Sequence, residues 1–102
     1  IDIDDYYGAI SDFNKALEIN PKDASSYYNR GIAKDLIKDY YGAISDYTKA
    51  IEIDPNKSNA FLNRSIVKEK IGDIECACLD AKKSVSLGDA ASDNQTWIKK
   101  NC

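Results

Sequence analysis

The chain has 102 residues, of which 43% are hydrophobic and 30% are charged, and its formal net charge is −3. At this length it forms at most one compact unit, and the negative charge argues against nucleic acid as a ligand and against an anionic membrane surface, since both require clustered Lys and Arg. No apolar run approaches the roughly 18 residues that span a bilayer, so we expect no membrane partner.

The first predicted helix runs from about residue 6 to Ile19. Its apolar side chains recur at the spacing of one helical face; they are Tyr6, Ala9, Ile10, Phe13, Ala16 and Leu17. Asp5 precedes this run and can accept hydrogen bonds from the first free backbone N–H groups, which predicts an N-cap. Asn20-Pro21 should end the helix, because the residue before a proline avoids helical dihedral angles.

Four more long helices carry similar signals. Residues 24–37 and 40–53 form the next two, capped by Asp23 and Asp39. They are followed by helices over residues 58–71 and 74–87 and by a shorter one over residues 92–100, with Asp73 as a further cap. Connections of about two to five residues make consecutive helices antiparallel neighbours. No segment reads as a strand, so we expect an all-α fold.

The helices recur with a fixed period. Residues 5–21 read DYYGAISDFNKALEINP and residues 39–55 read DYYGAISDYTKAIEIDP, so each residue lies 34 positions from its counterpart (39 − 5 = 34). A period of this size is typical of stacked supersecondary units, each of which buries its apolar face against the next. We therefore expect successive helix pairs to pack side by side.

The period and the residues at its positions resemble the tetratricopeptide repeat (TPR) family. The matching residues are small, aromatic or the closing proline: Ala9, Phe13, Ala16 and Pro21, then Tyr27, Gly31, Ala43, Tyr47, Ala50 and Pro55, then Phe61, Ser65, Ala77, Ala81 and Ser84. The resemblance covers about residues 5–89 and implies an α-solenoid, a superhelix of antiparallel helix pairs. The last repeat departs from the pattern, with Ala81 in place of an aromatic residue and Asp89 in place of the proline.

We therefore predict a single TPR domain over residues 1–102. Its parts are a partial repeat with only the second helix of a pair (residues 1–21), two full repeats (22–55 and 56–89) and a capping helix (90–102). Trp97 and Ile98 of the capping helix should cover the face of the last repeat. The sequence holds no Met, so we expect Ile1 not to be a native start.

Resemblance to TPR proteins also implies a concave groove that binds a peptide or a partner segment and is lined by the first helix of each pair. The groove-facing positions hold Ser25, Tyr28, Asn29, Ile32, Asp35 and Leu36, and then Asn59, Leu62, Asn63, Ile66, Glu69 and Lys70. Amide side chains can hold an extended peptide backbone, since they donate and accept hydrogen bonds at once, and apolar pockets beside them would select side chains.

Asn29 and Asn63 allow three interpretations. Chaperone-binding TPR domains clamp the terminal carboxylate of a peptide with an Asn at this position and with Lys, Asn and Arg from flanking repeats. Here Asn59 and Asn63 stand where Lys and Arg are expected, and the next repeat offers Asp93 and Trp97. These residues favour two other roles over a full clamp: ordinary polar groove residues, or ligands for the backbone of a non-terminal peptide.

The three cysteines allow at most one intramolecular pair. Cys76-Ala-Cys78 lacks the spacing and the second ligand pair of a zinc site, so we expect no metal. Cys78 and Cys102 could form a disulfide that pins the last helix, and two neighbouring reduced thiols are the alternative.

The sequence holds no His, which removes the commonest general base, and it shows neither a nucleophile–base pair nor a phosphate loop. We expect a protein-interaction module that is not an enzyme and has no cofactor. The alternative is a structural segment of a larger TPR protein that forms homo-oligomers, because the truncated first repeat leaves the flank of the Phe13 helix open.

Overall fold

The structure is a computed structural model, and it describes residues 3–88 and 92–102, with side chains from Gln95 onward in the second range. These residues form α1 (Ile3–Ile19), α2 (Ala24–Leu36), α3 (Tyr40–Ile53), α4 (Ser58–Lys70), α5 (Ile74–Ser86) and α6 (Ser92–Asn101). The described part of the chain contains no strand, and none of its helices is both long and apolar enough to cross a membrane. The predicted all-α fold is confirmed.

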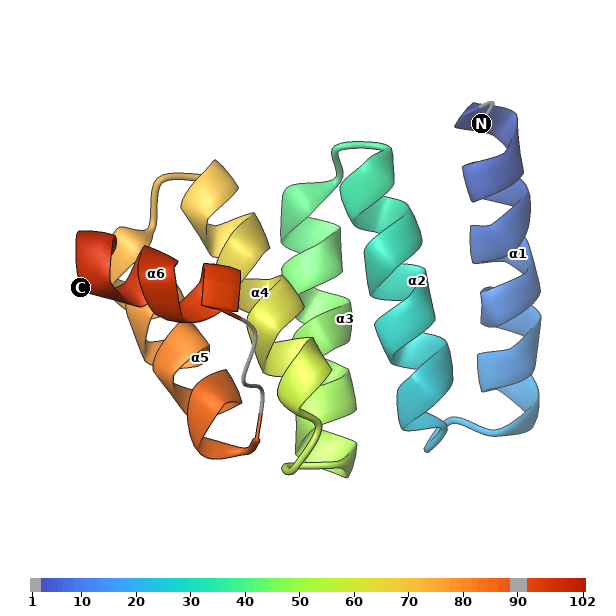
Figure 1. The fold of residues 1–102 in the computed structure, drawn as a ribbon. Coiled ribbons are helices and arrows are strands. Elements are labelled where there is room, and N and C mark those ends of the chain that lie inside the picture. Colours follow the sequence, from blue (N-terminus) through green and yellow to red (C-terminus); the bar gives the residue numbers. More distant parts are fainter. Residues whose placement is uncertain (1–2, 89–91) are drawn as a thin grey trace.

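The helices stack in chain order (Figure 1). α1 to α5 stand side by side, and each packs mainly against the helix before and the helix after it. α6 lies across the end of this row, against α5. The result is an elongated molecule of 40 × 27 × 20 Å with its two termini at opposite ends. This is the solenoid that the period of 34 residues predicted.

Aspartates begin three of the helices, as predicted. The carboxylate of Asp23 accepts hydrogen bonds from the backbone N–H groups of Ser25 and Ser26 at 3.1 and 3.4 Å. Asp39 and Asp73 do the same for α3 and α5, at 3.1 and 3.3 Å. These bonds satisfy N–H groups that the first helical turn leaves free.

The prediction that Asp5 is a cap is wrong. α1 begins at Ile3, so Asp5 lies in its first turn. The equivalent residues of the next repeat, 37–39, form a turn with Lys38 at φ 67°, because α2 folds back against α3 there. Among the described residues no helix packs in front of α1.

Small and aromatic residues let paired helices approach closely. On α3, Ala43 and Ala50 are fully buried and Tyr47 is 1% exposed. A Cβ atom added to Gly31 of α2 would lie 2.7 Å from Cε1 of Tyr47, so only glycine fits at this contact. Tyr47 and Val67 of α4 form the centre of the core, which places the best-packed region between α2 and α4.

A buried charge network also joins the helices of each full repeat. The guanidinium of Arg30 donates to both carboxylate oxygens of Asp46, at 2.9 and 2.7 Å, and Lys34 lies 3.0 Å from the same carboxylate. Arg30 also donates to Asn14 of α1 at 2.8 Å. One arginine thus connects three consecutive helices, and this network has a second copy at Arg64 with Asp80, Lys68 and Thr48.

At the C-terminal end, α6 is attached to α5 by a disulfide. Cys78 and Cys102 are bonded, with their Cα atoms 5.8 Å apart, and Cys76 is free. Trp97 is half-buried, and Ile98 lines a hollow of 300 Å³ together with Val85 of α5. The capping helix therefore covers part of the last repeat with few apolar side chains.

Candidate peptide-binding groove

The predicted groove residues lie on α2 and α4, the first helices of the two full pairs. Seven of the twelve are exposed: Ser25, Asn29, Leu36, Asn59, Ile66, Glu69 and Lys70. The other five are half-buried: Tyr28, Ile32, Asp35, Leu62 and Asn63. Leu36 and Ile66 are 50% and 41% exposed, which is high for large apolar side chains. The twelve side chains thus form a surface of amide, charged and apolar groups on α2 and α4, which we call the wall.

Two contacts tie α2 to α4 across this wall. The Asn63 amide donates to the hydroxyl of Tyr28 at 2.8 Å, and the Lys70 ammonium lies 2.9 Å from the Asp35 carboxylate. The two residues of each pair are about one repeat apart in the sequence. Side chains at nearly equivalent positions of α2 and α4 therefore contact each other. One N–H donor of the Asn63 amide is therefore used within the protein. The side chains of Asn29 and Asn59 are exposed to solvent.

Tyr28 is a half-buried aromatic residue of the wall. Its ring lies 5.8 Å from the ring of Tyr47, and the ammonium of Lys57 lies 4.9 Å from its centroid. Burial raises the pKa of Tyr28, and the hydrogen bond from Asn63 opposes this shift. Tyr28 is consequently a neutral, fixed side chain at physiological pH, better suited to packing than to proton transfer.

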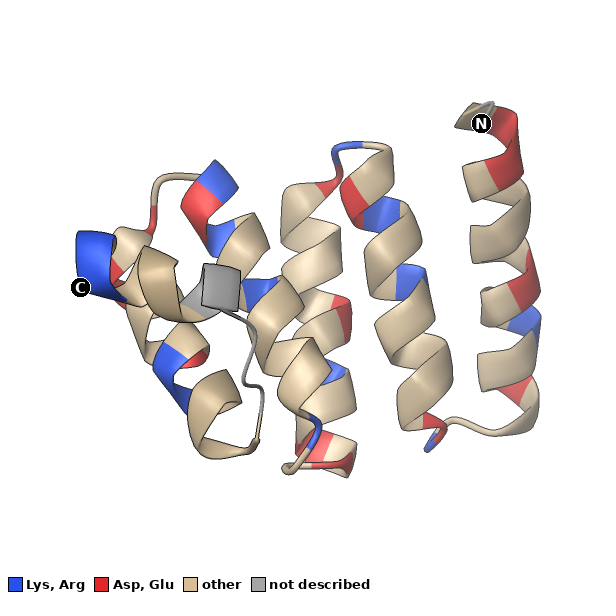
Figure 2. Ribbon diagram, viewed as in Figure 1, with Lys and Arg blue, Asp and Glu red and all other residues tan. Residues whose placement is uncertain are grey.

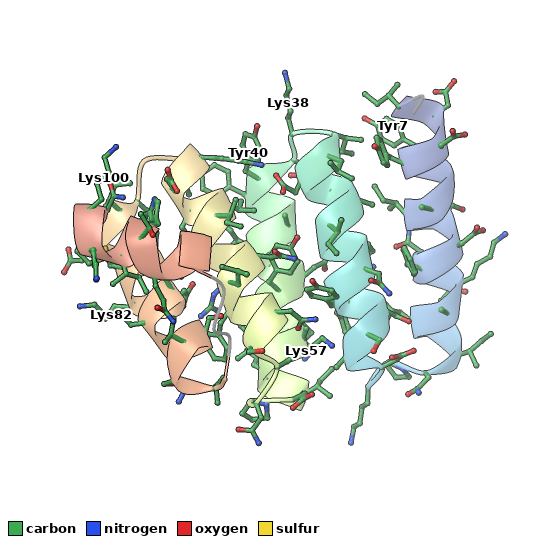
Figure 3. The ribbon with its side chains drawn as sticks, viewed as in Figure 1. Tyr7, Lys38, Tyr40, Lys57, Lys82 and Lys100 are labelled. Carbon is green, nitrogen blue, oxygen red and sulfur yellow. A yellow bond between two sulfur atoms is a disulfide. The ribbon has the colours of Figure 1, made fainter. Side chains whose placement is uncertain are left out.

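A lysine lies near each end of the wall. Figure 3 labels Lys57 at one end and, at the other, Tyr40, which Lys70 contacts. Lys70 lies 5.5 Å from the ring of Tyr40 at one end, and Lys57 lies against Tyr28 at the other. Both ammonium groups are thus partly engaged with aromatic faces. The sequence analysis gave Lys57 no role, because only its position after folding places it over Tyr28.

Two hollows lie elsewhere on the described surface. One, of 340 Å³, is lined by Tyr27, Arg30, Ser45, Asp46, Thr48, Lys49 and Glu52. The other, of 620 Å³, is lined by Pro21, Lys22, Tyr27, Lys49, Glu52 and Ile53. Neither includes any of the twelve predicted groove residues. Among the described residues no cluster of His, Cys, Asp or Glu is suited to a metal ion.

Family models match the N-terminal half of the chain. A model described as "Tetratricopeptide repeat" matches residues 24–57, and one described as "TPR repeat" matches residues 2–34. Together they cover residues 2–57, which include α1 to α3. The chain belongs to the tetratricopeptide repeat family.

Solved TPR structures share the fold. The first TPR of Spaghetti (RPAP3), bound to the HSP90 peptide SRMEEVD, has a TM-score of 0.89 at 21% identity, over 94% of this chain and 76% of that one. The Arabidopsis OM64 TPR domain has a TM-score of 0.89 at 24% identity, over 95% and 80%. The TPR2B domain of yeast Sti1, in a pHsp70 complex, has 0.88 at 23%, over 96% and 83%. The comparison with curated proteins found no match.

The TPR pattern led to the groove residues but not to the charge networks. The sequence analysis assigned no role and no partner to Arg30 and Arg64. A signal was present, since both full repeats hold Arg, then Lys four positions later and Asp sixteen positions later (34 − 30 = 4, 46 − 30 = 16). Asp89 and the side chain of Asp93, also named from the sequence, lie outside the described residues.

Proposed function

We propose that this TPR domain is a protein-interaction module, without catalytic activity, that binds an extended segment of a partner along α2 and α4. The observation that carries the proposal is the set of exposed, unlike side chains on these two successive helices. Asn29 and Asn59 offer donors and acceptors for a peptide backbone, and Leu36 and Ile66 offer apolar contacts for its side chains.

The known TPR complexes support a peptide as the ligand. The RPAP3 domain is bound to an HSP90 peptide, and the Sti1 domain is in a complex with pHsp70. Here the wall carries asparagines at the positions of the clamp cations, and the nearby Lys70 already pairs with Asp35. We therefore propose recognition of the backbone and apolar side chains of an internal peptide segment rather than of a terminal carboxylate.

A displayed library of random linear peptides, selected on the full chain, supplies the probe for the test. Asn29→Ala and Asn59→Ala should each weaken the selected peptides by about fivefold to tenfold, since each removes exposed hydrogen bonds to the ligand. Both variants should unfold at the wild-type temperature. Asn56→Ala, an equal change in the loop between α3 and α4, is the control and should bind normally. Selected peptides that bind all three variants equally would refute the site.

Self-association through α1 is the second candidate. It is supported by Phe13, which is only half-buried while its equivalent Tyr47 is buried. It is opposed by the charge of α1, which has Asp4, Asp5, Asp12 and Glu18 against Lys15. Light scattering at two protein concentrations decides, because a dimer of this kind must dissociate on dilution while a monomer keeps one mass.

A further inference from the structure

The contact between α5 and α6 lacks the apolar core that holds the equivalent helices one repeat earlier. Three residues that are at most 1% exposed form the centre of the core between α3 and α4: Ala43, Tyr47 and Val67. Their counterparts 34 positions later are Ala77, Ala81 and Asn101 (47 + 34 = 81, 67 + 34 = 101). A ring is thus replaced by a methyl group, and a buried valine by an exposed asparagine. The apolar side chains that remain on α6 are Trp97 and Ile98, both half-buried.

Two further features of this contact oppose the docking of α6. The indole Nε1 of Trp97 is buried and has no hydrogen-bond partner among the described residues, whereas water would supply one. Lys82 of α5 and Lys99 of α6 line the same hollow of 300 Å³, and neither makes an ion pair within the described part of the chain. Figure 2 shows basic residues on both helices, and Figure 3 labels Lys82. Like charges repel each other, so separation of the two helices relieves this repulsion.

The disulfide between Cys78 and Cys102 offsets this weak noncovalent contact. It holds the Cα atoms of the two residues 5.8 Å apart, so α6 cannot leave α5 while the bond is intact. The rest of the stack does not depend on this bond. Arg64 and Lys68 of α4 hold the buried Asp80 of α5 at 2.7 and 3.0 Å, and the best-packed region lies between α2 and α4.

We propose that this bond makes α6 a redox-sensitive cap. Reduction of the bond releases α6 from α5 while α1 to α5 stay folded, and reoxidation docks α6 again. The released state exposes the face of α5 that carries Cys78, Lys82 and Val85, together with the indole ring of Trp97. No residue of the wall takes part, so the inference goes beyond the proposed function and does not rest on it.

The reductant is a thiol compound, and the reaction is thiol–disulfide exchange. Cys102 is exposed and Cys78 is half-buried, so the thiolate of the reductant attacks the sulfur of Cys102 and forms a mixed disulfide. Cys78 leaves as a thiolate and takes up a proton. A second thiol group then attacks the sulfur of the reductant and frees Cys102 as a thiol. The protein gains two electrons and two protons, which the two thiol groups lose as they join in a disulfide.

The surroundings of the bond favour attack from outside the protein. Lys82 lies one helical turn after Cys78 on the same face of α5, and its positive charge favours negative charge on the leaving sulfur. Cys76 is two positions before Cys78, so its thiol points to another side of α5. Its hydrogen bond with the Asp73 carboxylate also raises the pKa of Cys76 and disfavours the attacking thiolate. Release of α6 therefore requires an added thiol.

Trp97 allows the release to be followed, because it is the only tryptophan of the chain. The full chain is equilibrated in buffers with increasing ratios of reduced to oxidised dithiothreitol. We expect the tryptophan emission to shift to longer wavelength in a single step as the bond is reduced, and to return on reoxidation. Amide hydrogen exchange, followed by mass spectrometry, should become about tenfold faster or more in α6 and change less than about twofold in α2 to α4.

Serine variants provide the matched controls. Cys102→Ser and Cys78→Ser should show the emission of the released state without reductant, and dithiothreitol should not change it. Cys76→Ser removes the free thiol and should respond to dithiothreitol like the wild type. An unchanged emission and an unchanged exchange rate of α6 in the reduced wild type would overturn the proposal. So would a loss of protection that extends over α1 to α5 together, or three free thiols in the protein kept in oxidised dithiothreitol.

Discussion

Residues 5–12 and 39–46 have the same sequence, DYYGAISD, but they lie in different environments. Asp39 caps a helix, whereas Asp5 lies inside one. Ala43 is fully buried and Asp46 is 3% exposed, whereas Ala9 is half-buried and Asp12 is exposed. The difference arises from the neighbours, because among the described residues α3 has a helix on both sides and α1 has one. In this repeat protein, burial is a property of the position in the stack, and the local sequence only permits it.

The two ends of the stack also differ in whether another helix covers their outer side. α5 is followed by α6, which is short and mostly polar but is joined to it through Cys78 and Cys102. α1 is followed on its outer side by no described helix at all. A covalent bond can hold a cap whose apolar contact is small, because it limits the number of conformations of the detached state. Among the described residues, the C-terminal end of the stack is thus closed by a bond, and no helix covers α1 on its outer side.

The largest effect should come from removing the aromatic ring next to each copy of DYYGAISD. Tyr47→Ala deletes a buried ring and should lower the free energy of unfolding by about 4 kcal/mol. Phe13→Ala deletes a half-buried ring and should cost about half as much. Urea denaturation followed by circular dichroism measures both. Equal losses would mean that the flank of α1 is covered in solution, and the comparison between the two helices would fail.

Breaking the bond at the other end should have the next largest effect. The disulfide closes a loop with a sequence separation of 24, and its loss should lower stability by about 3 kcal/mol in the loop-entropy model. Thermal melting with and without reductant measures this loss, and Cys102→Ser should show it without reductant. Cys76→Ser is the control and should melt like the wild type.

A thiol count establishes whether this bond forms in solution. Protein unfolded in urea without reductant should show one free thiol, that of Cys76. In the native protein this thiol should react slowly, because its hydrogen bond with the Asp73 carboxylate raises the pKa of Cys76 and disfavours the thiolate. Three free thiols would show that the cysteines are reduced and that α6 is held by noncovalent contacts only.

Neutralising the two equivalent aspartates should have a smaller and clearly unequal effect. Asp46→Asn leaves Arg30 and Lys34 without their carboxylate and should cost about 2 kcal/mol, since the amide keeps part of the hydrogen bonding. Asp12→Asn should change stability by less than about 0.5 kcal/mol, as for other surface substitutions. Chemical denaturation in low and high salt measures both. A large loss for Asp12→Asn would reveal an ion pair at α1, and the two equivalent aspartates would then not differ.

The sequence predicted the helices of this fold well because its signals are local. Caps such as Asp23 and the breaks at Pro21 and Pro55 lie next to the helices that they begin or end. The period of 34 residues can likewise be found directly in the sequence, without knowledge of the fold. It predicted the cap at Asp5 wrongly, because α1 begins two residues earlier, at Ile3, and Asp5 therefore lies inside its first turn. The partners of Asn63 and Arg30 were missed because Tyr28 and Asp46 reach them only after the helices stack.

The cap itself gives the smallest effect in the comparison of the two identical segments. Asp39→Ala removes the side chain that accepts from the Gly42 N–H at 3.1 Å, and it should lower stability by about 1 kcal/mol. Asp5→Ala should cost only a few tenths of this amount, because a carboxylate in the first turn interacts with the helix dipole but bonds no free N–H group. Asp39→Asn is the control, since an asparagine oxygen also caps and should restore most of the loss. Equal losses for the two alanine variants would mean that α1 begins at Asp5 in solution, and that residues 3–5 then form the same turn as residues 37–39.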